Sequence, residues 1–267
     1  MHSPPPMPRP ALILDLDGTL CLGDRPLPGA CEAVATLQRR GHRLVVLSNT
    51  LDPLPACQAR LERLGLDLPA QAFIPLMPLL LEFLQRELPG RTLFPLAEPA
   101  LTAQLEGAFR LSERPEEIEV VLAGPDPGLD HRRLTIGLRA LRRGARFIAT
   151  NLDPTCPTPD GEVPDAGAVV GALEAATGRR VQAVVGKPSR RMAAAALEAL
   201  QVPPEQAWLV GDSLVSDIRM ARRTGMTGVL VLSGTTCRQD LRRAPAQPHH
   251  VLDSLADLPA LLDRFPD

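Results

Sequence analysis

The chain has 267 residues, a formal net charge of −2, a pI near 6.2 and 45% hydrophobic residues. This length suits one large domain or two smaller ones, and the apolar content supports a real core. The weak net charge argues against a protein that binds nucleic acid through its phosphates, and no apolar run reaches the length of a membrane span. Five cysteines without a C-x-x-C spacing argue against a zinc cluster or a disulfide framework and favour a reducing cytoplasm.

Strands and helices alternate after a proline-rich start. Residues 1–10 contain no signal-peptide core and are interpreted as a tail. Apolar runs predict strands at 11–16 and 43–47, and helical periodicity predicts helices at 29–40 and 53–64. This alternation is typical of an α/β fold, a doubly wound parallel sheet with helices on both faces.

A second alternating block follows, with enough apolar residues for a small core of its own. Its expected helices and strands lie at 79–87, 92–96, 98–108, 119–122, 130–143, 146–149 and 166–177. The chain then returns to the first sheet with elements at 190–200, 207–210, 214–223 and 227–232. We therefore expect a Rossmann-like core of residues 11–72 and 181–267, with a smaller inserted α/β cap domain at 73–180.

The first strand ends in two carboxylates, Asp15 and Asp17, followed by Gly18 and Thr19. Because the backbone turns there, both carboxylates can approach one point. Two anions this close repel unless a cation or a proton lies between them, so the pair favours a hard divalent metal such as Mg2+. One carboxylate could attack phosphorus while its neighbour moves a proton. An ordinary Asp-Gly turn is the structural alternative.

Two further strand ends carry groups that suit phosphate. Ser48, Asn49 and Thr50 offer hydroxyl and amide donors for phosphoryl oxygens, although a turn or an N-cap explains this triplet better when it is taken alone. Lys187 follows an apolar run and precedes Pro188. A compact cation held in that turn can offset phosphate and carboxylate charge, whereas a single lysine is ordinarily a solvated surface group.

The fourth motif follows the expected strand at 207–210, which ends in Gly211 and Asp212, with Asp217 five residues later. Asp212 can complete the oxygen cage of a metal, and Asp217 could orient a neighbour or a metal-bound water. Both also suit the start of a helix, where the dipole favours negative charge. All four motifs fall at carboxyl ends of strands, where open α/β sheets bind ligands, and their joint occurrence favours a functional site.

In this order the four motifs resemble those of the haloacid dehalogenase-like (HAD) phosphohydrolases. The resemblance is closest to the subgroup typified by NagD and the p-nitrophenylphosphatase-like proteins, which carries its cap between the second and third motifs. Supporting stretches are L-P-G-A at 27–30, A-T-N-L-D at 149–153 and G-K-P-S at 186–189. The subgroup often has T-N-N at the second motif, where this chain has Thr50 in the last place, so the role of Thr50 stays open.

The resemblance implies a Mg2+-dependent phosphatase that hydrolyses a small phosphate monoester through an aspartyl-phosphate. Asp15 would be the nucleophile, and Asp17 would protonate the leaving group and then activate water. The residues that would bind the phosphoryl oxygens are Ser48, Asn49 and Lys187.

The resemblance also implies a metal site and a substrate-facing part of the cap. Asp15, the backbone carbonyl of Asp17, and Asp212 would hold Mg2+, with Asp217 as a supporting acid near the metal. The cap residues Asn151 and Asp153 would face the substrate, although the same stretch equally suits a strand-to-turn transition.

Other functions fit parts of the pattern. A phosphotransferase or mutase would use the same intermediate, and a non-catalytic protein could bind a phosphorylated ligand on this fold. A phospho-acceptor signalling domain is disfavoured because such domains are shorter and lack the inserted block. The expected partner is a small phosphorylated metabolite, among which sugar phosphates, nucleotide monophosphates, phosphoglycolate and glycerol phosphate stay unranked. Cap-mediated homodimers occur in the family, but no feature of the sequence demands one.

Overall fold

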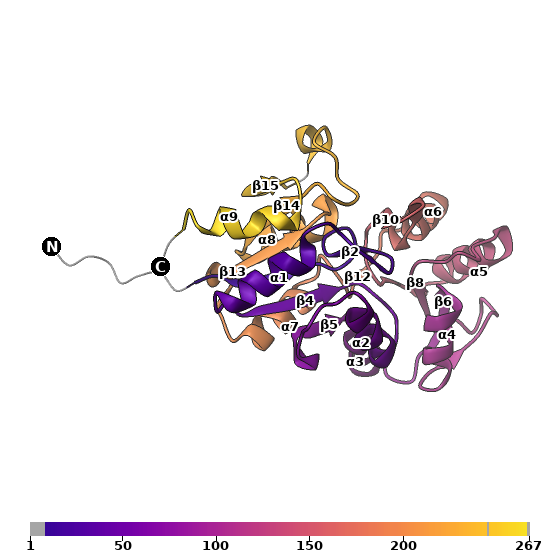
Figure 1. Ribbon diagram of the computed structural model, residues 1–267. Helices are drawn as coiled ribbons and strands as arrows, with labels where there is room; N and C mark the ends of the chain where they lie inside the picture. The colour runs from indigo at the N-terminus through magenta and orange to yellow at the C-terminus, as the bar shows by residue number, and fades with distance from the viewer. Residues whose placement is uncertain (1–8, 245, 266–267) are drawn as a thin grey trace.

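The computed structural model describes residues 9–244 and 246–265, so residues 1–8 of the predicted tail lie outside the described residues. Two parallel sheets form the centres of two lobes (Figure 1). The first and last parts of the chain, indigo and yellow, build the larger lobe, and the middle part, magenta, builds the smaller one. The smaller lobe is thus an insertion into the larger one.

The core sheet has six strands, all parallel. Their order is β15 (His250–Leu252), β14 (Thr227–Val231), β13 (Ala207–Gly211), β1 (Ala11–Leu14), β4 (Leu44–Ser48) and β5 (Phe73–Pro75). Every residue of β1 is buried, as expected for an apolar strand that is covered on both faces. The strand order reverses beside β1, so the carboxyl ends of β1, β4 and β13 border the crevice where such sheets bind ligands.

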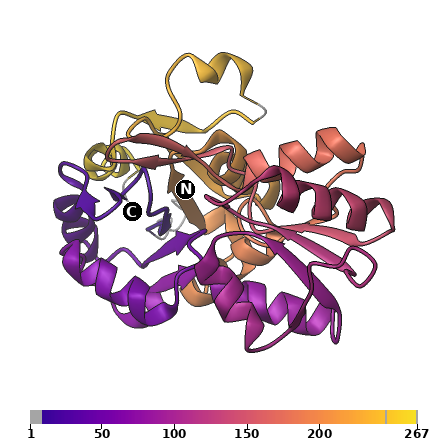
Figure 2. The same cartoon turned by 90° about the vertical axis from the view of Figure 1, so that its right-hand side faces the viewer.

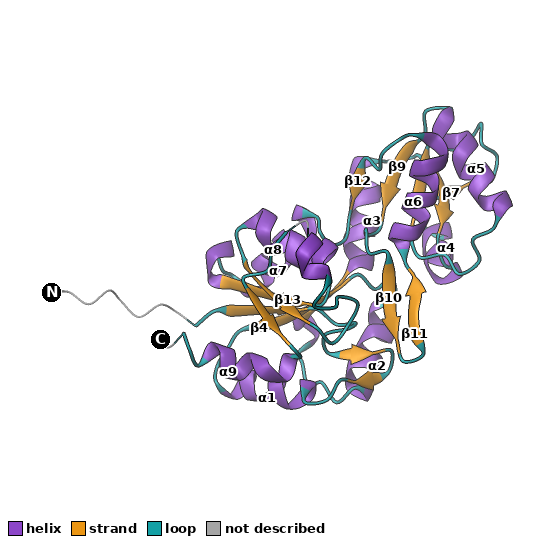
Figure 3. Cartoon of the chain, turned by 90° about the horizontal axis from the view of Figure 1, so that it is seen from above, coloured by secondary structure: helices purple, strands orange, loops and turns teal. Residues whose placement is uncertain are grey.

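Helices cover both faces of the core sheet (Figure 3). Those on one face are α7 (Arg190–Leu200) and α8 (Arg219–Thr224). Those on the other face are α1 (Ala30–Arg39), α2 (Leu54–Arg63) and α9 (Leu258–Leu262). Met192 of α7 shares a cluster with Ile13, whereas Leu61 of α2 shares one with Leu12. Neighbouring residues of β1 therefore face opposite layers, and the predicted doubly wound fold is confirmed.

The cap is a second layered α/β unit. Its parallel sheet has the order β12 (Ala183–Val184), β9 (Arg146–Ala149), β8 (Val120–Ala123), β6 (Thr92–Leu96) and β7 (Arg110–Leu111). Its helices are α3 (Leu76–Glu87), α4 (Pro99–Glu106), α5 (His131–Arg142) and α6 (Ala166–Thr177). The pair α5 and α6 packs on one face of this sheet, and the pair α3 and α4 packs on the other.

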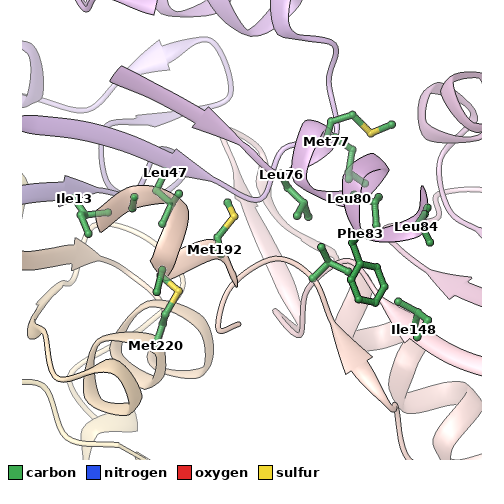
Figure 4. Close-up of a cluster of buried hydrophobic side chains, with 14 of the residues drawn as sticks. Ile13, Leu47, Leu76, Met77, Leu80, Phe83, Leu84, Ile148, Met192 and Met220 are labelled. Atoms are coloured by element: carbon green, nitrogen blue, oxygen red, sulfur yellow. The ribbon is translucent and has the colours of Figure 1, made fainter. Parts of the chain in front are cut away.

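Helix α3 joins the two lobes by hydrophobic contact (Figure 4). Leu76 and Leu80 belong to one cluster that also contains Ile13 of the core sheet and Ile148 of the cap sheet, and all four side chains are fully buried. Protein interiors of this kind are closely packed and transmit displacements. The cap is therefore attached to the core by a continuous apolar layer as well as by the connecting chain.

The strand pairing moves the expected domain boundaries by a few residues. β5, which begins at the predicted start of the cap, pairs with β4 of the core sheet. β12, which lies after the predicted end of the cap, pairs with β9 of the cap sheet. We propose that the domains follow the sheets, so that the cap begins after Pro75 and ends after Val184.

Two short antiparallel hairpins are absent from the sequence-based prediction. They are β2 (Cys21–Leu22) with β3 (Arg25–Pro26), and β10 (Thr155–Thr158) with β11 (Gly161–Pro164). The second hairpin extends from the cap toward the core (Figures 2 and 3). Pro157 and Pro164 lie within its strands, and proline weakens a strand pattern because it removes a backbone donor.

The helix predicted at 214–223 begins differently. A π-helical turn at Leu214–Ile218 precedes α8. Within this turn the carboxylate of Asp217 accepts a hydrogen bond from the backbone N–H of Ser213 at 3.1 Å. Widened turns of this type are frequent at functional sites, and this one directs Asp217 back toward the end of β13.

Candidate active site

Three neighbouring core strands bring the predicted site residues together. Asp15 follows β1, Asp212 follows β13, and Ser48 is the last residue of β4. Lys187 comes from the loop after β12, 172 residues from Asp15 along the chain. These residues line a cavity of about 300 Å³ whose other walls come from the cap. The carboxyl edge of the core sheet is therefore one wall of the site, as its topology predicts.

Lys187 is buried between two carboxylates. Its ammonium group donates to Asp15 and, at 2.8 Å, to Asp217, and its side chain is only 3% exposed. Burial alone lowers the pKa of Lys187, but Asp15 and Asp217 raise it by more, so the pKa lies above its usual value. The lysine thus stays charged, and it can balance added negative charge at this point.

Three carboxylates converge beside this lysine. Asp15, Asp212 and Asp217 each offer an oxygen, and the three oxygens lie within 4.8 Å of one another. Burial, followed by the charge of Asp217, raises the pKa of Asp212 to about 7. Burial also raises the pKa of Asp15, against the opposing effect of Lys187. A buried set of hard oxygen ligands that is costly to ionise fits a divalent cation, and the oxygen chemistry suits Mg2+.

Glycines leave room for Asp212. Gly18, in the turn after Asp17, has a φ of +83°, and a Cβ there would lie 2.4 Å from Oδ2 of Asp212. A Cβ on Gly234 would lie 2.0 Å from the same oxygen. That oxygen also accepts hydrogen bonds from the backbone N–H and the hydroxyl of Thr235, at 2.7 and 3.0 Å. Gly18 therefore serves both the turn and the close approach of the Asp212 carboxylate.

The side chain of Asp17 lies outside the cluster of three carboxylates. Its Oδ1 accepts a hydrogen bond from Nη2 of Arg60 at 2.6 Å. Arg60 lies on α2, and the same nitrogen donates to the backbone carbonyl of Gly23 at 2.8 Å. Sequence reasoning missed Arg60, because an arginine on an amphipathic helix ordinarily indicates a solvated charge and no motif links positions 43 residues apart.

Ser48 and Asn49 of the second motif line the same cavity but make different contacts. Ser48 is buried, and its hydroxyl oxygen accepts from the backbone N–H of Thr50 at 3.1 Å, which leaves its proton available to a ligand. Asn49 accepts from the backbone N–H of Lys187 at 2.9 Å and donates to Asp153 at 3.1 Å. The amide of Asn49 therefore holds the backbone of Lys187 and contacts the cap, and its predicted phosphate-binding role stays a prediction.

Both predicted cap residues reach the cavity. Asp153 accepts from the hydroxyl of Ser213 at 2.7 Å as well as from Asn49, so it bonds two core residues at once. Asn151 donates to the carboxylate of Asp165 at 3.4 Å and accepts from the backbone N–H of Asp153 at 2.8 Å. Asp165, the N-cap of α6, also lines the cavity. Its sequence context predicts only a helix N-cap.

This arrangement combines the parts that acyl-phosphate chemistry requires. A buried carboxylate, Asp15, lies beside a fixed cation and two further carboxylates, and a hydroxyl donor, Ser48, lines the same cavity. Asp17 lies two residues from Asp15, and both face the cavity. An attacking carboxylate and a proton donor could therefore act on one phosphorus atom in this cavity.

Family models and similar proteins assign this chain to the same family. Residues 12–108 match the model of the haloacid dehalogenase-like hydrolases, and residues 184–258 match the HAD-hydrolase-like model. The sugar-phosphatase AraL of Bacillus subtilis (strain 168) is 32% identical over 265 residues, which cover 98% of this chain and 96% of that protein. The two segments that the family models match contain all four motifs, and most of the cap lies between them.

Solved structures agree with this match. The p-nitrophenyl phosphatase from Archaeoglobus fulgidus superposes with a TM-score of 0.81 at 31% identity, covering 95% of this chain and 100% of that chain. A glycerol phosphate phosphatase from Mycobacterium tuberculosis, solved in complex with magnesium, superposes with a TM-score of 0.77 at 27% identity and covers 94% of this chain and 76% of that chain. Among the described residues, no helix combines the length and apolarity that a membrane crossing requires. The chain belongs to the haloacid dehalogenase-like hydrolases, in their p-nitrophenylphosphatase-like subgroup.

Proposed function

We propose that the protein is a Mg2+-dependent phosphatase that hydrolyses small phosphate monoesters through an aspartyl-phosphate on Asp15. The observation that carries this proposal is the buried ion pair of Lys187 with Asp15 beside Asp212 and Asp217. The relatives reported above are named phosphatases, so family membership supports a phosphoric monoester hydrolase. The substrate is a small phosphorylated metabolite, since the cavity holds only about 300 Å³.

The residues around Asp15 have distinct roles in this proposal. Lys187 and the hydroxyl of Ser48 bind the phosphoryl oxygens, and Asn49 holds the backbone of Lys187 in place. Asp15, the backbone carbonyl of Asp17, and Asp212 hold Mg2+. When bound, Mg2+ offsets the negative charge of the phosphoryl group and of the surrounding carboxylates.

Asp217 holds Lys187 in position. Its carboxylate accepts from Lys187 at 2.8 Å and from the backbone N–H of Ser213 at 3.1 Å, and its side chain is fully buried. These contacts fix the ammonium group of Lys187 beside Asp15. Asp217 therefore orients the lysine and adds negative charge next to the metal ligands.

The reaction proceeds in two steps. A carboxylate oxygen of Asp15 attacks phosphorus, and the ester P–O bond breaks. Asp17, protonated on the oxygen that does not accept from Arg60, gives its proton to the leaving oxygen. Asp17, now a carboxylate, takes a proton from water while that water attacks the aspartyl-phosphate, which releases inorganic phosphate and restores Asp15. The cap covers one side of the cavity, with Asp153 bonded to Asn49 and Ser213 of the core.

The test is phosphate release from a panel of small phosphomonoesters, including p-nitrophenyl phosphate, with and without Mg2+. Metal-dependent release is expected, with a loss of at least roughly 10³-fold in the Asp15→Asn variant, as for other covalent nucleophiles. Retention of near-normal activity by that variant would show that Asp15 is not the nucleophile. Absence of release from every ester would favour a transferase or a non-catalytic phosphate-binding protein instead.

A further inference from the structure

The carboxylate of Asp153 belongs to the cap, but both of its oxygens bond to residues of the core. Its Oδ2 accepts from the side-chain amide of Asn49 at 3.1 Å, and its Oδ1 accepts from the hydroxyl of Ser213 at 2.7 Å. Asn49 follows β4, and Ser213 comes shortly after β13. One carboxylate of the cap therefore joins the ends of the two core strands that flank β1.

The first of these bonds leads to the backbone of Lys187. Oδ1 of Asn49 accepts from the backbone N–H of Lys187 at 2.9 Å, while Nδ2 of the same amide donates to Asp153. A carboxylate only accepts hydrogen bonds, so it must face the NH2 side of the amide. A reversed amide would place its oxygen against the carboxylate and its NH2 group against a backbone N–H, and both contacts would be repulsive. Asp153 therefore fixes the orientation in which Asn49 holds Lys187.

The second bond leads to the ammonium group of the same lysine. Ser213 donates from its hydroxyl to Asp153 and from its backbone N–H to Oδ2 of Asp217 at 3.1 Å. The other oxygen of Asp217 accepts from Nζ of Lys187 at 2.8 Å. The hydroxyl oxygen of Ser213 also accepts from the backbone N–H of Ser216 at 3.2 Å, which leaves its own proton for Asp153. Two hydrogen-bond chains thus run from Asp153 to the two ends of Lys187.

Two glycines leave space for these chains. A Cβ on Gly186 would lie 2.5 Å from Oδ1 of Asn49, and a Cβ on Gly211 would lie closer still to the carboxylate of Asp217. Neither position could hold a side chain without displacing the amide or the carboxylate. The loop before Lys187 and the end of β13 therefore admit Asn49 and Asp217 at the distances that the two chains need.

Burial makes these contacts important for the position of the lysine. Lys187 is 3% exposed, Asp217 is fully buried and Ser213 is 8% exposed. When one member of a buried hydrogen-bonded network is removed, its partners lose more than solvated groups would, because water does not readily take the vacated place. Removal of the Asp153 carboxylate should therefore disturb both ends of Lys187.

We propose that Asp153 is a positioning residue for Lys187, and that the cap thereby contributes to binding of the phosphoryl group. The inference rests on the proposed function in one respect, the assignment of Lys187 to the phosphoryl oxygens. Both oxygens of Asp153 are engaged with the core, so its effect passes through the lysine and not through a contact with the leaving group. The loss on its removal is the same for every ester, because all of them share the phosphoryl group.

The first measurement is the dissociation constant of inorganic phosphate, determined by calorimetry with Mg2+ present. Inorganic phosphate has no leaving group, and calorimetry requires no turnover. Asp153→Ala should raise this constant about tenfold, the scale on which hydrogen-bond partners behind a ligand-binding group typically act. Asp153→Asn keeps one accepting oxygen and should raise it by a smaller factor, about threefold. Asp160→Ala removes an exposed carboxylate of the same cap and should leave the constant unchanged.

The second measurement separates the lysine from the leaving group. It compares kcat/KM of Asp153→Ala with that of the native protein for p-nitrophenyl phosphate and for an alkyl ester, glycerol 3-phosphate. The two factors of loss should agree within about twofold, because both esters lose the same interaction at the phosphoryl group. Ser213→Ala already breaks one of the two chains. In that variant the further change Asp153→Ala should therefore cost less than it does in the native protein.

The outcomes separate this inference from the proposed function. An unchanged dissociation constant in Asp153→Ala would overturn the inference, and so would a loss of kcat/KM confined to one ester, which would place Asp153 against the leaving group. If Asp153→Ala does not fold, an unchanged constant in Asp153→Asn, which keeps the shape of the side chain, would overturn it equally. A native protein that binds phosphate but hydrolyses no ester would overturn the proposed function alone, since calorimetry would still decide the role of Asp153. A native protein that does not bind phosphate would overturn both.

Discussion

Arg60 holds Asp17 by a hydrogen-bonded ion pair, with Nη2 of the arginine 2.6 Å from Oδ1 of the aspartate. The arginine side chain is 15% exposed and the aspartate side chain 26% exposed, so solvent screens the pair only partly. The same guanidinium reaches the carbonyl of Gly23 in the β2–β3 turn. Arg60 therefore holds Asp17 and the β2–β3 hairpin that follows it, and we interpret it as a positioning residue for Asp17.

Replacement of Arg60 should affect turnover more than substrate binding. Arg60→Gln is expected to lower kcat about tenfold with little change in KM, because a displaced acid loses part of the 10²–10⁴-fold that proton transfer typically contributes. Arg60→Lys should recover only part of the loss, since lysine cannot hold Asp17 and Gly23 in the same planar geometry. Steady-state kinetics with p-nitrophenyl phosphate measure both parameters.

Arg63 provides the control for this prediction. It lies on the same helix, is more than half exposed, and pairs only with Asp24 among the ion pairs described for it. Arg63→Gln should therefore leave kcat unchanged. Equal losses in the two variants would mean that the general charge of α2, and not the contact of Arg60 with Asp17, supports activity.

Asp15→Asn should stabilise the metal-free protein at neutral pH. Burial and the charges of Asp217 and Asp212 raise the pKa of Asp15 despite Lys187, so ionisation of this group is unfavourable in the folded state. The amide removes that cost, and a rise of about 2–4 °C in the midpoint of thermal unfolding is the scale of a small stabilisation in a chain of this length. The measurement uses protein treated with a chelator. A lower midpoint would show that the pairing of Asp15 with Lys187 outweighs the repulsion.

Magnesium should stabilise the folded protein through Asp212. At about 100 times its dissociation constant, a bound ion adds about 2.7 kcal/mol to the free energy of unfolding. Asp212→Asn should abolish most of this shift, while Asp240→Asn, which removes an exposed aspartate, should keep it. Thermal unfolding with and without Mg2+ measures the shift without reference to activity. A full shift in Asp212→Asn would remove Asp212 from the metal site.

Asp165 should make stability depend on pH in mildly acidic solution. Burial raises the pKa of Asp165 from 3.8 to about 6, so the folded state binds this proton more tightly than the unfolded state does. The resulting stabilisation is present below about pH 4 and is lost as pH rises to about 6. Asp165→Asn keeps a side chain that can cap α6 but does not titrate. The free energy of unfolding of the variant relative to the native protein should therefore rise between pH 4.5 and pH 7.

Chemical denaturation at these two pH values measures the change. Asp160 is an exposed aspartate in the turn between β10 and β11. Asp160→Asn should show no comparable change between the two pH values. A relative stability of Asp165→Asn that stays constant with pH would show that the native carboxyl titrates normally in the folded protein.

Local sequence determined the elements of the fold and the chemistry of the strand ends. The strand at Thr92–Leu96, the strand at Arg146–Ala149 and the helix at Arg190–Leu200 have the predicted bounds, because an apolar run or a helical stripe specifies burial within one segment. The carboxylates of Asp15 and Asp212 could be placed together from sequence, since both follow parallel strands of one sheet. Hairpin β10–β11 could not, because its prolines and polar residues carry no strand period.

Only the tertiary structure decided which partners these groups have. Lys187 meets Asp15 across 172 residues, and Arg60 meets Asp17 across 43, through the packing of α2 and of the cap onto the core sheet. Asp165 enters the cavity because α6 lies on the cap sheet, although its own sequence signals only an N-cap. Periodicity reports whether a residue is buried, whereas the partner of a buried charge depends on how distant segments pack, and no local pattern contains that information.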